Sequence, residues 1–130
     1  MIGYATLGTN DPARAKAFYD AFLGELGATR LAEMPDTREL TFWGTARNRP
    51  MLAVGRPYDG QAPSPGNGAM IALSAPSRAE VDRLHACALE LGATDEGAPG
   101  LRGPEKLGYY FAYFRDPDGN KIALFKVGAE

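Results

Sequence analysis

Two stretches of the chain carry apolar residues at the three- and four-residue spacing of an amphipathic helix. The first, residues 12–23, follows Asn10 and Asp11, and either side chain can cap the free N–H groups at a helix start. The second, residues 78–91, follows Ser77, which begins a Ser-x-x-Glu capping box. A glycine follows each stretch directly, where helices commonly stop. The pattern therefore predicts two helices, one in each half of the chain.

Short apolar segments bounded by Pro, Gly and Asn surround both stretches and are typical of β-strands. One such segment precedes each predicted helix, and three follow it. The expected strands are residues 2–9, 29–34, 38–43 and 51–56 in the first half, and residues 69–75, 94–98, 108–115 and 121–127 in the second half. The order β-α-β-β-β therefore occurs twice.

A five-residue repeat indicates an internal duplication. Residues 25–29 and residues 90–94 both read Glu-Leu-Gly-Ala-Thr, and each copy ends the predicted helix of its half. We therefore predict an α+β fold in a single domain, in which residues 1–58 form the first module, residues 59–68 a Pro- and Gly-rich linker, and residues 69–130 the second module.

The most aromatic segment, residues 109–114, does not alternate with polar residues, so the strand is expected to be covered on both faces. The Asp-Pro-Asp-Gly-Asn sequence after it predicts a tight loop, across which Arg115 pairs with Lys121. Directly opposed residues share a face of the sheet. The residues that this register places on the face away from the helix are Tyr109, Phe111, Tyr113, Ala123 and Phe125.

Composition narrows the classes of function. Apolar residues make up 45% of the chain and charged residues 23%, the proportions of an ordinary globular protein. The formal net charge is −2 and the basic residues are scattered, so we expect no nucleic-acid partner. No apolar run approaches the roughly 20 residues that span a bilayer, so we expect no membrane partner. The single cysteine, Cys87, and the absence of a signal peptide favour a cytoplasmic location.

Four short motifs mark the chain in a fixed order. Thr-Leu-Gly-Thr-Asn-Asp at residues 6–11 closes the first strand, and Ala-Phe-Tyr at residues 17–19 lies in the first helix. Gly-Asn-Gly at residues 66–68 precedes the second module, and Tyr-Phe-Arg-Asp-Pro-Asp-Gly-Asn at residues 113–120 precedes the last strand. Together, over almost the whole chain, they resemble the vicinal-oxygen-chelate superfamily, which includes glyoxalase I, fosfomycin- and bleomycin-resistance proteins and extradiol dioxygenases.

The resemblance implies that the two modules form a curved, mostly antiparallel, U-shaped sheet around a central cavity. Members of the superfamily usually hold a divalent metal there with His and Glu side chains from the strands. This chain has Tyr4, Met70 and Ala123 at the positions that we align with those ligands. Such metals prefer imidazole and carboxylate ligands, and these three side chains offer neither. We therefore expect no metal and no other cofactor.

The other groups that could support metal or nucleophile chemistry have plainer interpretations. His85, the only histidine, falls in the middle of the second helix, where we expect a partly exposed residue. Cys87 lies on a different side of that helix and is expected to be packed, so the two cannot form a catalytic pair. Asp116, Asp118 and Asn120 are expected to be turn residues, because the Gly and Glu that a calcium loop needs do not follow them.

What remains is an aromatic lining on the face that the resemblance turns toward the cavity. The residues predicted to line it are Tyr4, Thr6, Met70, Tyr109, Phe111, Tyr113 and Phe125, with Arg115 and Lys121 at its rim. Buried phenols need hydrogen-bond partners, which favours a ligand site over side chains that simply fill a core. The core interpretation stays open beside it.

Three functions fit this lining. The first is a metal-free protein that binds a small, largely apolar or aromatic molecule to sequester or carry it, as bleomycin-resistance proteins do. The second is a metal-independent enzyme of lyase or isomerase type, with Tyr4 or Tyr113 as general acid and Arg115 stabilising an anion. The third is a metal-dependent, glyoxalase- or dioxygenase-like enzyme with other ligands. The candidates for those ligands are Glu33, Glu39 and Glu105.

We also expect a homodimer. Two four-stranded halves leave open strand edges and incompletely covered faces, which a two-fold interface can hide. The resemblance supports this expectation, because related proteins often build their cavities across or beside such an interface.

Overall fold

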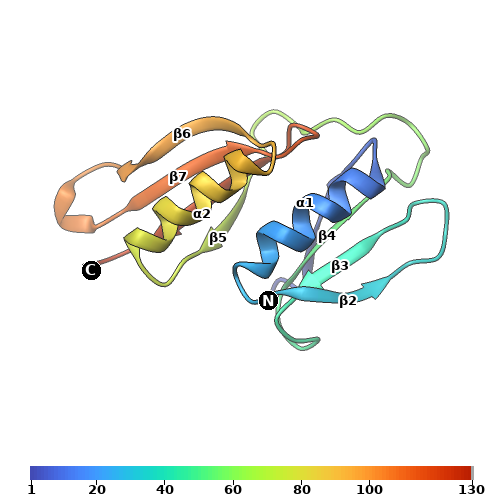
Figure 1. The fold of residues 1–130 in the computed structure, drawn as a ribbon, viewed down its shortest axis with the longest axis horizontal. Coiled ribbons are helices and arrows are strands. Elements are labelled where there is room, and N and C mark those ends of the chain that lie inside the picture. Colours follow the sequence, from blue (N-terminus) through green and yellow to red (C-terminus); the bar gives the residue numbers. More distant parts are fainter. Residues whose placement is uncertain (130) are drawn as a thin grey trace. The chain divides into compact units, whose positions relative to one another are not determined.

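Each half of the chain folds into one long helix and a mixed four-stranded sheet (Figure 1). The computed structural model describes residues 1–129 and groups them in two units, residues 1–66 and the chain from residue 67 onward. The boundary falls inside the predicted linker, residues 59–68. The predicted α+β class and the repeated β-α-β-β-β order are both confirmed.

In the first unit the first strand pairs with the last. Its elements are β1 (Tyr4–Gly8), α1 (Pro12–Gly24), β2 (Thr29–Glu33), β3 (Thr41–Gly44) and β4 (Met51–Gly55). The strand order is β1-β4-β3-β2, in which β1 and β4 run parallel and the other pairs are antiparallel. Both neighbours of β4 are therefore strands of the same unit.

The second unit repeats this topology. Its elements are β5 (Ile71–Ser74), α2 (Arg78–Glu90), β6 (Thr94–Leu101), a short 3-10 helix η1 (Glu105–Leu107), β7 (Tyr110–Arg115) and β8 (Lys121–Lys126). The order is β5-β8-β7-β6, again with one parallel pair, β5 with β8. The predicted register between β7 and β8 is confirmed, since Arg115 lies opposite Lys121 and Phe111 opposite Phe125. Helix η1 was not expected from the sequence.

Local capping explains where both long helices begin. The Asp11 carboxylate accepts a hydrogen bond from the N–H of Arg14 at 3.1 Å, which settles the choice between Asn10 and Asp11. The Ser77 hydroxyl accepts from the N–H of Glu80, also at 3.1 Å. The Glu80 carboxylate binds the Arg83 guanidinium instead of the Ser77 N–H. Within residues 1–129, only the serine half of the predicted capping box is therefore formed.

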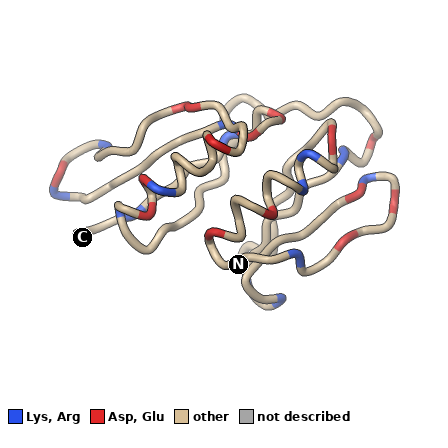
Figure 2. The backbone as a smooth tube through the Cα atoms, viewed as in Figure 1, with Lys and Arg blue, Asp and Glu red and all other residues tan. Residues whose placement is uncertain are grey.

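Each helix covers one face of its own sheet. In the first unit the helix face of the core consists of Phe18, Tyr19, Phe22, Trp43, Leu52 and Val54, and in the second unit of Val81, Leu84, Ala88, Ala112, Phe114, Ile122 and Leu124. Burial of these side chains is the main source of stability for such small sheets. Basic and acidic residues are interspersed along both units (Figure 2). Neither long helix has the length and apolar character that crossing a bilayer would demand, within the described part of the chain.

Candidate functional site

Three stacked rings lie on the face of the second sheet opposite α2. The Phe111 ring stacks on Tyr113 with a centroid distance of 6.0 Å and on Phe125 with a distance of 5.4 Å. Tyr110 points the other way, and its hydroxyl donates to the Asp82 carboxylate of α2 at 2.7 Å. The alternation predicted for β7 is therefore confirmed. We call Phe111, Tyr113 and Phe125 the aromatic face.

Glycines of β6 leave room for these rings. Gly97 lies opposite Tyr113 and Gly100 opposite Phe111, on a strand whose pairing with β7 is interrupted twice by register shifts. A Cβ atom at Gly97 would lie 2.8 Å from Cδ2 of Tyr113, which is closer than side chains approach one another. The Tyr113 ring therefore leans over a part of β6 that only glycine can occupy in this geometry.

Two cations lie over the Tyr113 ring. The guanidinium carbon of Arg102 is 5.6 Å from the ring centroid, and the ammonium nitrogen of Lys121 is 5.3 Å from it. Lys121 was placed at the rim by the sequence, whereas Arg102 was missed. The chain around Arg102 has no hydrophobic periodicity, and the shifts in β6 decide where its side chain falls.

The cation that the sequence favoured is engaged elsewhere. Arg115 pairs with the Glu96 carboxylate at 3.0 Å, and its Nη1 donates to the carbonyl oxygen of Gly119, also at 3.0 Å. Its charge is therefore balanced by a carboxylate of β6. The other two candidate catalytic residues lie in different units. Tyr113 belongs to the aromatic face of the second unit, and Tyr4 lies on β1 of the first unit.

His85 is buried, with only 6% of its surface exposed, so the expectation of a partly exposed residue is wrong. The helix turns this side chain toward β6 and β7, where Nε2 lies 3.1 Å from the Tyr113 carbonyl oxygen and 3.1 Å from Asp95 Oδ1. Both partners accept hydrogen bonds, so Nε2 carries the proton. A hydrogen bond from the Gly97 N–H lowers the pKa of the Asp95 carboxyl below its ordinary value, and the bond from His85 lowers it further. Cys87, expected to be packed, is half-buried.

In the first unit, β1 contributes to a cavity of about 440 Å³. Tyr4 and Thr6, both predicted site residues, line it together with Arg38, Arg56 and Tyr58. The Tyr4 ring also meets Phe42 edge-on at a centroid distance of 5.1 Å. The sequence did not indicate the last three lining residues, because they come from loops whose course depends on the folded sheet.

Both arginines of this cavity have carboxylate partners. Arg38 binds Asp36, which lowers the pKa of that carboxyl, and the Arg38 guanidinium lies 5.7 Å from the Tyr58 ring centroid. Arg56 pairs with Glu39 at 3.4 Å. The positive charges of this cavity are therefore compensated, unlike those over Tyr113.

The structure brings some of the seven predicted lining residues together. Phe111, Tyr113 and Phe125 form the aromatic face, while Met70 and Tyr109 in the same unit are 44% and 41% exposed. Tyr4 and Thr6 line the cavity of the first unit. A single pocket shared by all seven stays a prediction.

The residues at the expected metal positions do not fit a divalent metal. Ala123 has no donor atom and is fully buried, Met70 offers a thioether, and the Tyr4 phenol packs against Phe42. In the described residues, no three His, Cys, Asp or Glu side chains are grouped so as to hold a metal ion.

Two of the three alternative carboxylate ligands are engaged in ion pairs. Glu33 accepts a hydrogen bond from Arg30 at 3.0 Å and lies 3.6 Å from the Lys16 ammonium. Glu39 pairs with Arg56, and Glu105 begins η1 in the other unit. Glu33 and Glu39 therefore already balance basic side chains of their own unit.

Comparison with known proteins points to one family. The model of the Glyoxalase/Bleomycin resistance protein/Dioxygenase superfamily matches residues 1–124. A glyoxalase/bleomycin resistance protein from Albidiferax ferrireducens is 33% identical, with a TM-score of 0.79 over 96% of this chain and 97% of that one. No curated protein matches the chain.

Two more distant structures share the fold. A glyoxalase/bleomycin resistance protein/dioxygenase family enzyme from Burkholderia phytofirmans is 19% identical, with a TM-score of 0.76 over 97% of this chain and 98% of that one. A lactoylglutathione lyase from Agrobacterium tumefaciens is 24% identical, with a TM-score of 0.66 over 96% of this chain and 92% of that one.

Proposed function

Because the chain belongs to the glyoxalase/bleomycin resistance protein/dioxygenase superfamily, we propose that it binds a small, largely apolar or aromatic molecule without a metal, to sequester or carry it. The observation that carries the proposal is the aromatic face, in which the Phe111 ring stacks on both Tyr113 and Phe125. All three rings are half-buried, so part of their surface is left for a ligand. Planar aromatic molecules stack on such rings with a gain beyond the area that they bury.

The absence of metal chemistry is part of the proposal. It is supported by the donor atoms at the three aligned positions, since Ala123 has none, Met70 has a thioether and Tyr4 a phenol. A ligand held by stacking and hydrogen bonds needs no metal to orient it. The binding roles of Thr6 and Tyr109, and of Tyr4 and Met70, are predictions of the same proposal.

Binding of a neutral aromatic probe, 2-naphthamide, tests the proposal. We expect it to quench tyrosine or tryptophan emission and to raise the melting temperature, because a ligand of the native state stabilises that state. Tyr113→Ala should weaken the binding by about 1–3 kcal/mol through lost stacking and a lost hydroxyl contact.

The matched control is Tyr110→Ala, on the same strand but facing α2. It should lower stability and leave the affinity for 2-naphthamide unchanged. If Tyr113→Ala has no effect on affinity while Tyr110→Ala abolishes binding, the ligand binds on the α2 side of the sheet and the proposed site on the aromatic face is wrong. If 2-naphthamide and related aromatic compounds leave the melting temperature unchanged, the rings are core packing.

A metal-independent enzyme is the second candidate, favoured by the surroundings of Tyr113. Within residues 1–129 its hydroxyl makes no hydrogen bond, and Arg102 and Lys121 lie over its ring. A neutral phenol can donate a proton to a bound substrate. Mass spectrometry of a bound compound before and after incubation distinguishes turnover from carriage, and Tyr113→Phe should abolish turnover while keeping most of the affinity.

A further inference from the structure

Two cationic groups meet at one ring of the aromatic face. Arg102 and Lys121 both lie over Tyr113, at 5.6 and 5.3 Å from the ring centroid. Within residues 1–129 neither cation forms an ion pair. Cation–π contact with one tyrosine balances neither charge, so two half-buried positive charges lie beside this ring.

The backbone fixes the position of Arg102. Its Nη2 donates to the carbonyl oxygen of Ala98 at 2.6 Å, and its Nη1 to that of Leu101 at 3.3 Å. A Cβ atom at Gly100 would lie 3.0 Å from Nη1, so the guanidinium rests on glycine backbone. Carbonyl groups hold the guanidinium without neutralising it, and they use only two of its five N–H donors.

Three carboxylates of the second unit that lie near Tyr113 in the sheet or its hairpin loop are engaged elsewhere. Glu96 pairs with Arg115 at 3.0 Å. Asp95 binds His85, on the side of the sheet that α2 covers. Asp116 is buried in the hairpin loop and accepts hydrogen bonds from the backbone of that loop. Within residues 1–129, therefore, none of these three carboxylates pairs with Arg102 or Lys121.

We propose that Arg102, Lys121 and Tyr113 form an anion-binding subsite, so that the ligand of the aromatic face is an aromatic compound with a carboxylate or phosphate group. This inference rests on the function proposed above and specifies the class of its ligand. A guanidinium matches two oxygens of a carboxylate or phosphate, an ammonium adds a compact charge, and the phenol adds a further donor. The aromatic part of the ligand stacks beside them, on Phe111 or Phe125.

Three naphthalene compounds that differ in one group test the subsite by isothermal titration calorimetry. These are 2-naphthoate, 2-naphthyl phosphate and the neutral 2-naphthamide. We expect at least one anion to bind about tenfold more tightly than the amide, as charge-assisted hydrogen bonds at a partly exposed site would give. The anion that binds more tightly identifies the group, and added salt should weaken its binding more than that of the amide.

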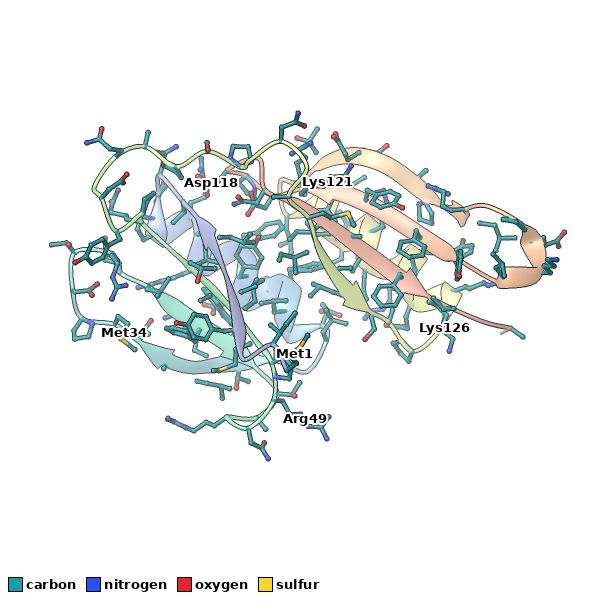
Figure 3. All side chains as sticks on the ribbon, turned by 180° about the vertical axis from the view of Figure 1, so that it is seen from behind. Met1, Met34, Arg49, Asp118, Lys121 and Lys126 are labelled. Atoms are coloured by element: carbon teal, nitrogen blue, oxygen red, sulfur yellow. The ribbon has the colours of Figure 1, made fainter. Side chains whose placement is uncertain are left out.

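Charge-removing variants locate the effect. Arg102→Gln and Lys121→Gln should each lower the affinity for the preferred anion, and the double variant should bind it no more tightly than the amide. Lys126→Gln is the matched control, because it removes the same charge from the other end of β8 (Figure 3), opposite Tyr110, whose side chain faces α2. It should leave all three affinities unchanged.

The outcomes separate this inference from the proposed function. If the wild-type protein binds the amide as tightly as both anions, or if Lys126→Gln acts like Lys121→Gln, the subsite is refuted and the aromatic site stands. If none of the three compounds binds, both proposals fail. Should the double variant fold poorly, Arg102→Lys with Lys121→Arg must retain the preference for the anion while each single Gln variant reduces it.

Discussion

The indole N–H of Trp43 donates a hydrogen bond of 2.9 Å to the carboxylate of Asp20, which lies on α1 while Trp43 lies on β3. The Trp43 side chain is almost fully buried, at 1% exposure, so its one polar atom depends on this acceptor. The same carboxylate binds Arg30 of β2 at 2.8 Å. One acidic residue therefore connects the helix to two strands of its sheet.

Removal of the Asp20 carboxylate should destabilise the first unit. Asp20→Ala leaves a buried indole N–H without its acceptor, and we expect a loss of about 1–3 kcal/mol in the free energy of unfolding. Asp20→Asn keeps an acceptor oxygen and loses only the exposed pair with Arg30, so it should cost about 0.2–1 kcal/mol. Urea unfolding followed by tryptophan emission gives both values. Equal losses for the two variants would show that the indole hydrogen bond contributes nothing.

Stability should depend on Asp95 at acid pH. The pKa of this carboxyl is lowered in the folded state, first by the Gly97 N–H and then by His85, from an ordinary value of 3.8. Its ionised form is thus favoured by folding, and its contribution is complete above the ordinary value and lost as pH falls through the lower folded pKa. Unfolding curves between neutral and strongly acid pH should therefore show a shallower acid loss for Asp95→Asn than for the wild type. An identical acid slope would contradict this role.

We expect no metal ion to be bound to the folded protein or to contribute to its stability. Ala123, Met70 and Tyr4 stand where metal ligands are expected, and we predict that the purified chain carries no stoichiometric transition metal. Elemental analysis after removal of any affinity tag checks this directly. A chelator should leave the melting temperature unchanged. About one Zn, Ni, Fe or Mn ion per chain would instead support the metal-dependent alternative.

We predict a homodimer in solution. Each sheet has two edge strands, β1 and β2 in the first unit and β5 and β6 in the second, and unpaired edges favour association. Register shifts interrupt the pairing of β2 and β6, which makes these two edges poorer templates for another strand. Light scattering at micromolar concentration should give twice the chain mass of 13.9 kDa. A single-chain mass would contradict the prediction.

The features predicted from the sequence are those that local residue patterns determine. Helical spacing and capping residues identified both long helices, and the Asp-Pro-Asp-Gly-Asn loop with strand alternation identified the register that opposes Phe111 and Phe125. The strand β6 was predicted too short, because Gly97 and Gly100 give it neither apolar alternation nor β-propensity. Arg102 could not be assigned to the site, because only the shifted register of β6 brings it over Tyr113.

The parallel pairs have a consequence for the time course of folding. Strand β8 is synthesised last in its unit, yet it lies between β5 and β7, and Ile122 pairs with Ile71, about 50 residues earlier in the chain. Strand β5 therefore has no partner of its own until residues 121–126 leave the ribosome, and the second sheet is completed in a single late step. The interval before that step is when an unpaired β5 can capture the β8 of another chain, so slow synthesis of this segment should favour strand-exchanged oligomers.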